Sequence, residues 1–124
     1  MLDEKLIEVI KTPPDSAFAI VTQSNGDSHV VNSWNSYIEI SGDEIVVPVG
    51  RMLKTEDNLK VDNRVKLTIT NREVMGERYK GTGFLVSGTA FMTSEGTYFD
   101  LIKSKFPWAR AALVVSCAVC EQTL

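Results

Sequence analysis

Histidine and cysteine are scarce in this sequence, and the shortage excludes several kinds of site. The 124 residues include one histidine, His29, and two cysteines, Cys117 and Cys120. One imidazole and two thiols are too few for a four-ligand zinc site or for the other common transition-metal sites. His29 has no matching nucleophile and acid for a catalytic triad. We therefore predict no metal site and no triad, and we expect His29 to be a solvated strand residue, with a ligand contact as the alternative.

An excess of basic charge and a long apolar segment are also missing. Thirteen lysines and arginines are mixed with sixteen aspartates and glutamates, for a net charge of −3, so no basic surface is expected for nucleic acid. No apolar run approaches the roughly 20 residues of a membrane span. The acids Asp3 and Glu4 near the start are atypical of a signal peptide. We expect a cytoplasmic protein that binds neither nucleic acid nor membranes.

Residues suited to acid-base catalysis are not evident either. No carboxylate stands alone in an apolar run, which is the setting that raises its pKa for proton transfer. The G-x-G-x-x-G fingerprint of nicotinamide-binding domains is absent. These absences favour a binding pocket over a reaction centre built from side chains.

The composition that remains is that of an ordinary globular protein, with 44% hydrophobic and 23% charged residues. A chain of this length predicts one domain over residues 1–124 with a single core. Apolar periodicity and turn signals predict a mostly β protein. We expect short helices over 2–10, 55–62 and 94–106, and six strands over 17–22, 28–40, 44–49, 65–70, 84–93 and 109–119.

Six strands joined mostly by short turns predict a closed or nearly closed antiparallel barrel, with the helices over its ends and seam. The segment 72–83 contains three glycines and several charges, which predicts a long loop. In an extended final strand, Cys117 and Cys120 would point to opposite faces about 10 Å apart, too far for a disulfide. We expect buried, reduced, structural thiols, with a redox pair or metal ligation as alternatives.

Two polar segments could line a pocket for an anionic ligand. Asn32, Ser33, Trp34 and Asn35 interrupt a predicted strand with groups that can bind phosphate and hydroxyls, although a tryptophan is more often a core residue. The segment 50–55 places a glycine, two cations and a hydroxyl at a helix start, where free N–H groups and the helix dipole favour an anion. An ordinary capped surface helix is the alternative.

A third segment, Gly81-Thr82-Gly83, could let the backbone approach a flat ring, because glycine has no Cβ to clash. A plain turn from loop to strand is an equally good interpretation of these three residues alone. Each of the three segments is weak evidence by itself, and their combination predicts a polar, glycine-containing pocket.

Taken together, these segments resemble the small FMN-binding electron-transfer proteins of the pyridoxamine-phosphate-oxidase-like flavin split barrels. The resemblance spans nearly the whole chain. It is carried by several blocks in matching order: Val31-Asn32-Ser33-Trp34-Asn35-Ser36-Tyr37, Ile45-Val46-Val47-Pro48-Val49-Gly50, Met52 with Lys54-Thr55-Glu56, Gly81-Thr82-Gly83-Phe84-Leu85, Trp108-Ala109-Arg110-Ala111-Ala112-Leu113-Val114, and Glu121-Gln122-Thr123-Leu124.

The resemblance implies a six-stranded antiparallel split β-barrel with Greek-key connections and short flanking helices. It also implies an FMN-binding homodimer that carries electrons between partners such as a cytochrome or a ferredoxin. FMN supplies its own redox chemistry, which agrees with the missing catalytic acids. A flavin reductase or small-molecule oxidase of the same fold is the first alternative, and a flavin storage or sensing module is the second.

The resemblance also assigns roles to particular residues. Asn32, Ser33, Trp34, Asn35, Lys54 and Thr55 would hold the phosphate and ribityl chain, and Pro48, Val49 and Gly50 would present backbone to the isoalloxazine. Gly81 and Thr82 would also approach the flavin. Trp34, Tyr37 and Trp108 would be aromatic neighbours of the ring, and Leu124 would cover the flavin across the dimer interface.

Overall fold

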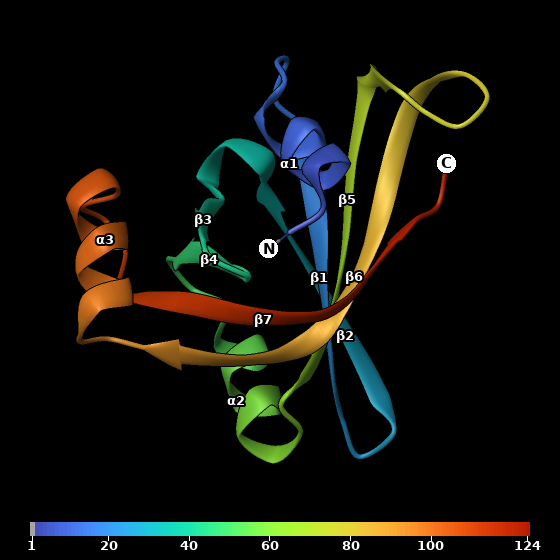
Figure 1. The fold of residues 1–124 in the computed structure, drawn as a ribbon. Coiled ribbons are helices and arrows are strands. Elements are labelled where there is room, and N and C mark those ends of the chain that lie inside the picture. The colour runs from blue at the N-terminus through green and yellow to red at the C-terminus, as the bar shows by residue number, and fades with distance from the viewer. Residues whose placement is uncertain (1) are drawn as a thin grey trace.

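The computed structural model describes residues 2–124, in which seven strands form one antiparallel sheet with three α-helices around it (Figure 1). The helices are α1 (Glu4–Lys11), α2 (Leu53–Val61) and α3 (Thr97–Lys105). The strands are β1 (Ala17–Ser24), β2 (Asp27–Trp34), β3 (Glu39–Ser41), β4 (Glu44–Val49), β5 (Arg64–Met75), β6 (Lys80–Thr93) and β7 (Ala111–Gln122). Their order across the sheet is β2-β1-β5-β6-β7-β4-β3. The mostly β class is confirmed.

The prediction of six strands is wrong because the segment 28–40 forms two strands. A turn of 3-10 helix, Asn35–Tyr37, separates β2 from β3. Asn35 leaves the β1–β2 ladder here: its backbone N–H donates to Ser16 O at 2.8 Å, and its Nδ2 donates to Thr70 O at 2.9 Å. The chain then turns, so that β3 pairs with β4 instead of extending β2.

The sheet bends strongly, but its closure into a barrel is not confirmed. The start of β6 pairs with β5, and the start of β7 pairs with β4, so these two long strands join two halves of the sheet. Figure 1 shows both strands sweeping from the β5–β6 hairpin to the base of α3. Within residues 2–124, no pairing connects the edge strands β2 and β3.

The predicted long loop over 72–83 is wrong as well, because most of this segment is strand. Asn71 pairs with Thr82 and Met75 pairs with Lys80, which leaves only residues 76–79 between β5 and β6. Val74 is buried in the core. The glycines that suggested a loop mark close approach instead: a Cβ added to Gly83 would lie 2.8 Å from the Thr70 side chain.

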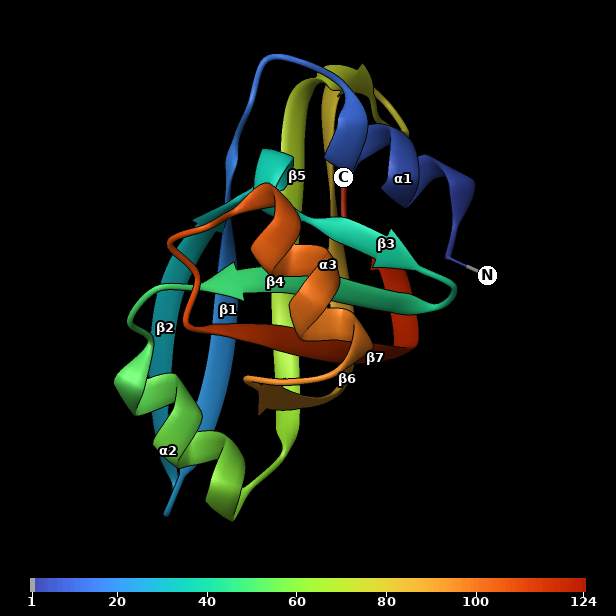
Figure 2. The same cartoon turned by 90° about the vertical axis from the view of Figure 1, so that its left-hand side faces the viewer.

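β4 from Ile45 onward and β7 over residues 111–115 are apolar without a break because both faces are covered there. Ile45 and Leu113 belong to the main core, which α1 closes with Leu6, whereas Val46 and Val114 pack beneath α3. Figure 2 shows α3 lying across β4 and β7. Strands buried on both faces lose the alternation of polar and apolar residues. None of the helices described in residues 2–124 is long and apolar enough to cross a membrane.

A β-bulge in β7 corrects the expected placement of the two cysteines. Cys117 pairs with Gly88 and Cys120 pairs with Val86, so Ala118 is an extra residue in the ladder. Because Gly88 and Val86 lie two residues apart, both cysteines face the same side of the sheet and interact. Both thiols are only partly buried, so the expectation of buried cysteines is not met. Burial and the neighbouring Cys120 raise the pKa of Cys117 to about 12, which disfavours the reactive thiolate.

Candidate functional site

A surface depression of about 310 Å³ lies where the end of β2 meets the connection between β4 and α2. Six of the residues expected in the site line it: Asn32, Ser33, Trp34, Pro48, Gly50 and Trp108. Tyr37, expected as an aromatic neighbour, also lines it, together with Val31, Arg51 and Met52. The structure therefore brings together three segments that are far apart in the sequence.

Two half-exposed indoles give the depression an aromatic wall. Trp34 is 49% exposed and Trp108 is 52% exposed. The Trp108 ring is held by Tyr37, whose ring centroid is 5.7 Å away, and by Phe106 at 5.8 Å. A Cβ added to Gly50 would lie 3.4 Å from Trp108, so the glycine lets this indole pack on bare backbone. Such a wall fits a flat aromatic ligand.

The start of α2 supplies the other half of the site, a cluster of free donors. Met52 precedes the helix in the left-handed conformation, with φ of 50°, and its side chain provides no cap. The N–H groups of the first helical turn therefore lack partners within the helix and favour an anion. Arg51 and Lys54 are exposed beside this turn and add positive charge. A phosphate group fits this arrangement.

Two buried oxygen atoms next to the depression lack partners. Among the side chains described in residues 2–124, Asn35 Oδ1 and Thr55 Oγ1 are the buried polar atoms without a hydrogen bond. Leaving such an atom unsatisfied costs roughly 1–3 kcal/mol. Asn35 directly follows the Trp34 wall, and Thr55 lies in the first turn of α2. Both segments thus retain hydrogen-bonding capacity that the described residues do not use.

Gly81, Thr82 and Leu124 do not line the depression. Thr82 is buried, and its Oγ1 accepts a hydrogen bond from Gln122 Nε2 at 3.0 Å. Leu124 is held to the β5–β6 hairpin through its carbonyl oxygen, which accepts from Glu77 N at 2.8 Å, while its side chain is 61% exposed. Figure 1 shows the C-terminus beside this hairpin and α2 at the opposite end of the molecule.

Four further expected residues adjoin the depression without lining it, namely Asn35, Val49, Lys54 and Thr55. Val49 and Thr55 are fully buried, and the Val49 carbonyl oxygen accepts from Arg110 N at 2.9 Å. Met52 and Arg110 stand in blocks that carry the resemblance, but the sequence assigns neither of them a role in the site. Arg110 binds the backbone of the β4–α2 connection, but nothing in its sequence context identifies those partners.

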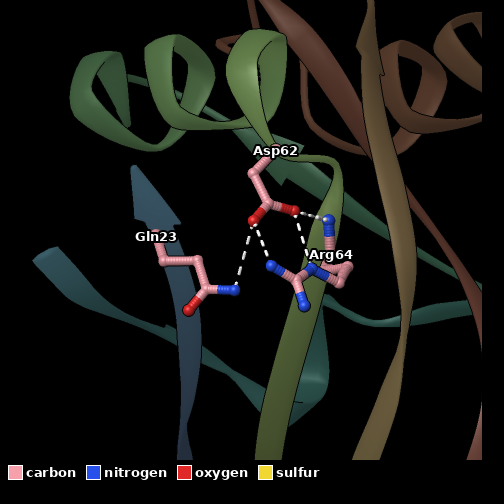
Figure 3. Close-up of polar contacts among 3 residues, drawn as sticks. All are labelled: Gln23, Asp62 and Arg64. Carbon is pink, nitrogen blue, oxygen red and sulfur yellow. Dashed lines mark hydrogen bonds and ion pairs between the residues drawn. The ribbon is translucent and has the colours of Figure 1, made fainter. Parts of the chain in front are cut away.

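The titratable groups with shifted pKa values lie outside the depression. The largest change is at Asp62, which ends α2: the Arg64 guanidinium and backbone N–H hold the pKa of this carboxyl far below its ordinary value, with help from Gln23 (Figure 3). Tyr98, whose hydroxyl donates to Glu44, has a raised pKa. Within residues 2–124, no group of three or more potential ligand side chains is placed to hold a metal ion.

Comparison with known proteins identifies the fold of this protein. No family model matches the sequence. The structure resembles a putative pyridoxamine 5'-phosphate oxidase from Lactobacillus delbrueckii, with a TM-score of 0.69 and 12% identity over 97% of this chain and 93% of that one. It also resembles an FMN-binding protein from Syntrophomonas wolfei, with a TM-score of 0.76 and 20% identity over 98% and 85% of the two chains. The fold is therefore that of the pyridoxamine-phosphate-oxidase-like proteins.

The sequence comparison is more specific. A curated FMN-binding protein from Nitratidesulfovibrio vulgaris (strain Miyazaki F) is 46% identical over 125 residues, and the match covers all of both chains. This chain belongs to the family of that FMN-binding protein. The resemblance inferred from the sequence blocks is thereby confirmed.

Proposed function

We propose that this protein binds FMN in the depression between β2, the β4–α2 connection and Trp108. The observation that carries the proposal is the pairing of an aromatic wall with a helix start rich in free donors. The wall matches the isoalloxazine ring, and the helix start matches the phosphate. The 46% identity to an FMN-binding protein supports the same assignment.

The residues around the depression divide between the parts of FMN. Trp34, Trp108 and the backbone from Pro48 to Gly50 would hold the ring. The first turn of α2, with Lys54 and Thr55, would hold the phosphate. Asn32 and Ser33 of β2, with Asn35 directly after the strand, would serve the ribityl hydroxyls. When bound, FMN supplies reversible one- and two-electron chemistry.

An electron carrier is the function that this site supports best. The groups with shifted pKa values, Asp62, Arg64, Tyr98, Cys117 and Cys120, all lie away from the depression. Groups with shifted pKa values are the ones suited to moving a substrate proton, and these groups lie elsewhere in the protein. The site is sufficient for a flavin that accepts electrons from one protein and passes them to another, such as a cytochrome or a ferredoxin.

We propose further that the protein works as a homodimer. Gly81, Thr82 and Leu124 lie away from the depression of their own chain, so they can reach a flavin only if a second copy brings them there. Large apolar side chains are exposed around the same hairpin, including Met75 and Tyr79, and a partner copy would bury them. A cytoplasmic location, predicted from the sequence, stays a prediction.

The visible absorption spectrum of the purified protein, before and after FMN is added, tests the cofactor. We expect a yellow protein with a flavin spectrum and one FMN per chain. A colourless protein that does not bind added FMN would contradict the proposal.

Rapid mixing tests electron transfer. The flavin is reduced chemically without oxygen and mixed with an oxidised cytochrome or ferredoxin, and we expect fast reoxidation of the flavin. Steady consumption of NADH or NADPH would instead favour a flavin reductase. A reduced flavin that transfers electrons to neither acceptor would favour storage or sensing.

A further inference from the structure

Arg110 holds the turn from which α2 starts. It lies just before β7, and its backbone N–H donates to Val49 O at 2.9 Å. Its Nε donates to Gly50 O at 3.1 Å and to Arg51 O at 3.2 Å, and its Nη2 also donates to Arg51 O. Three successive carbonyl groups of the β4–α2 connection are therefore fixed by one residue located about 60 positions further along the chain.

These contacts determine the direction of the N–H groups in the same turn. In a trans peptide the C=O and the following N–H point in opposite directions. Because the Gly50 and Arg51 carbonyls point to Arg110, the N–H groups of Arg51 and Met52 point away from it. Both of these residues line the depression, and Arg110 does not. Together with the first turn of α2, their N–H groups form a concave set of donors of the kind that binds anions.

Arg110 also compensates a charge that would oppose an anion. Glu56 lies in the first turn of α2, and its Oε1 is 3.3 Å from Arg110 Nη2. Both side chains are largely shielded from solvent, with exposures of 35% for Arg110 and 29% for Glu56. The ion pair directs the carboxylate toward Arg110, which offsets its repulsion of a phosphate at the helix start.

We propose that Arg110 is the positioning residue that makes this site specific for a phosphorylated flavin. It acts through the backbone of residues 50–52 and does not contact the ligand. The inference rests on the proposed FMN site and adds to it the residue that orients the phosphate donors. A lysine cannot replace Arg110, because an ammonium group lacks the planar fork that binds two carbonyls at once.

The test compares FMN with riboflavin, which has the same ring and ribityl chain but no phosphate. Arg110→Lys and the wild-type protein are titrated with each flavin, and binding is followed by quenching of flavin fluorescence. We expect Arg110→Lys to weaken FMN binding roughly tenfold or more, since hydrogen bonds to a charged group are at stake. Riboflavin binding should change little, so the affinity ratio of FMN to riboflavin falls.

Arg64→Lys is the matched control, because Arg64 also forms a forked contact, with Asp62, but lies outside the depression. It should keep the wild-type ratio. If Arg110→Lys does not yield folded protein, Arg110→Gln, whose neutral amide group can still donate hydrogen bonds, is judged by the same ratio. An unchanged ratio of FMN affinity to riboflavin affinity, which includes the case in which both flavins bind more weakly by the same factor, would overturn the positioning role. Failure of the wild-type protein to bind FMN would instead refute the proposed function.

Discussion

At the scale of single residues, Trp108 and Arg110 affect the same ligand in different ways. Trp108 presents a half-exposed ring to the depression, whereas Arg110 acts through the backbone behind it. A residue that contacts the flavin ring should affect the binding of FMN and of riboflavin to the same extent. A residue that orients phosphate donors should influence FMN alone. The two side chains therefore have distinguishable effects on binding.

We expect Trp108→Leu to weaken the binding of FMN and of riboflavin by the same factor, about threefold to tenfold. An aromatic contact contributes roughly 0.5–1.5 kcal/mol to binding beyond its buried area. Fluorescence titration with each flavin measures the two dissociation constants. Phe91→Leu is the control, since Phe91 is also a half-exposed aromatic residue but does not line the depression. A loss confined to FMN would contradict the placement of the ring against Trp108.

Asp62 allows a prediction about pH. Its Oδ1 accepts from Arg64 N and Nε, each at 3.0 Å, and its Oδ2 accepts from Arg64 Nη2 at 2.7 Å and from Gln23 Nε2 at 3.2 Å (Figure 3). The side-chain hydrogen bond with Arg64 is the main cause of the lowered pKa of this carboxyl. Because the folded pKa is below the unfolded one, the contribution to stability is present above pH 4 or so and declines as the pH falls.

Asp62→Asn should therefore lower the Tm at pH 7 by a few degrees at most, since the pair is near the surface. The difference from the wild-type protein should shrink as the pH falls from about 4 to 2. Thermal unfolding at a series of pH values measures this. A difference that stays constant over that range would show that the ionised carboxylate is not responsible.

At the scale of elements, the sequence predicts local pattern well and long-range partners poorly. The strand cores over 17–22, 44–49 and 65–70 were predictable because hydrophobic periodicity and turn residues act locally. The break after Trp34 was not, because Asn35 bonds to Ser16 and Thr70, which are distant in the sequence. The depression could be assembled only from the resemblance, and the partners of Arg110 depend on how β4 and β7 pair.

The bulge in β7 also depends on its partner strand, β6. It explains why residue 88 of β6 is a glycine. A Cβ added to Gly88 would lie 1.9 Å from Ser116 O and 3.0 Å from Ser116 C. Since both contacts are with backbone, no side-chain rotation can relieve them. The extra residue Ala118 is thus accommodated only because β6 has no side chain opposite the bulge.

Gly88→Ala should destabilise the protein by about 2–4 kcal/mol and lower the Tm by roughly 10 °C or more. Ser87→Ala, one position earlier in β6, is the control and should change stability by less than about 0.5 kcal/mol. Urea unfolding followed by circular dichroism measures both variants. Equal stability of the two would mean that the bulge relaxes without cost.

At the scale of the whole molecule, the residues predicted for the site are divided between two opposite ends of the folded protein. The depression lies beside the connection that leads into α2. Figures 1 and 2 show α2 at one end of the molecule and the β5–β6 hairpin with the C-terminus at the other. A homodimer that joins the end of one copy to the opposite end of its partner would complete both sites at once. Flavin affinity would then depend on protein concentration, because dissociation of the dimer leaves half of each site behind.

Removal of Leu124 tests this arrangement. The deletion takes away an exposed leucine and the carbonyl that accepts from Glu77 N, whereas Leu124→Ala takes away the side chain and keeps the carbonyl. We expect both variants to weaken FMN binding, the deletion more strongly, because it also releases the hairpin. Val119→Ala, which trims an exposed apolar residue of β7, should bind FMN like the wild-type protein. Light scattering after size exclusion, combined with FMN titration, measures assembly and affinity together. If the deletion alters neither, Leu124 does not cover the flavin of a partner copy.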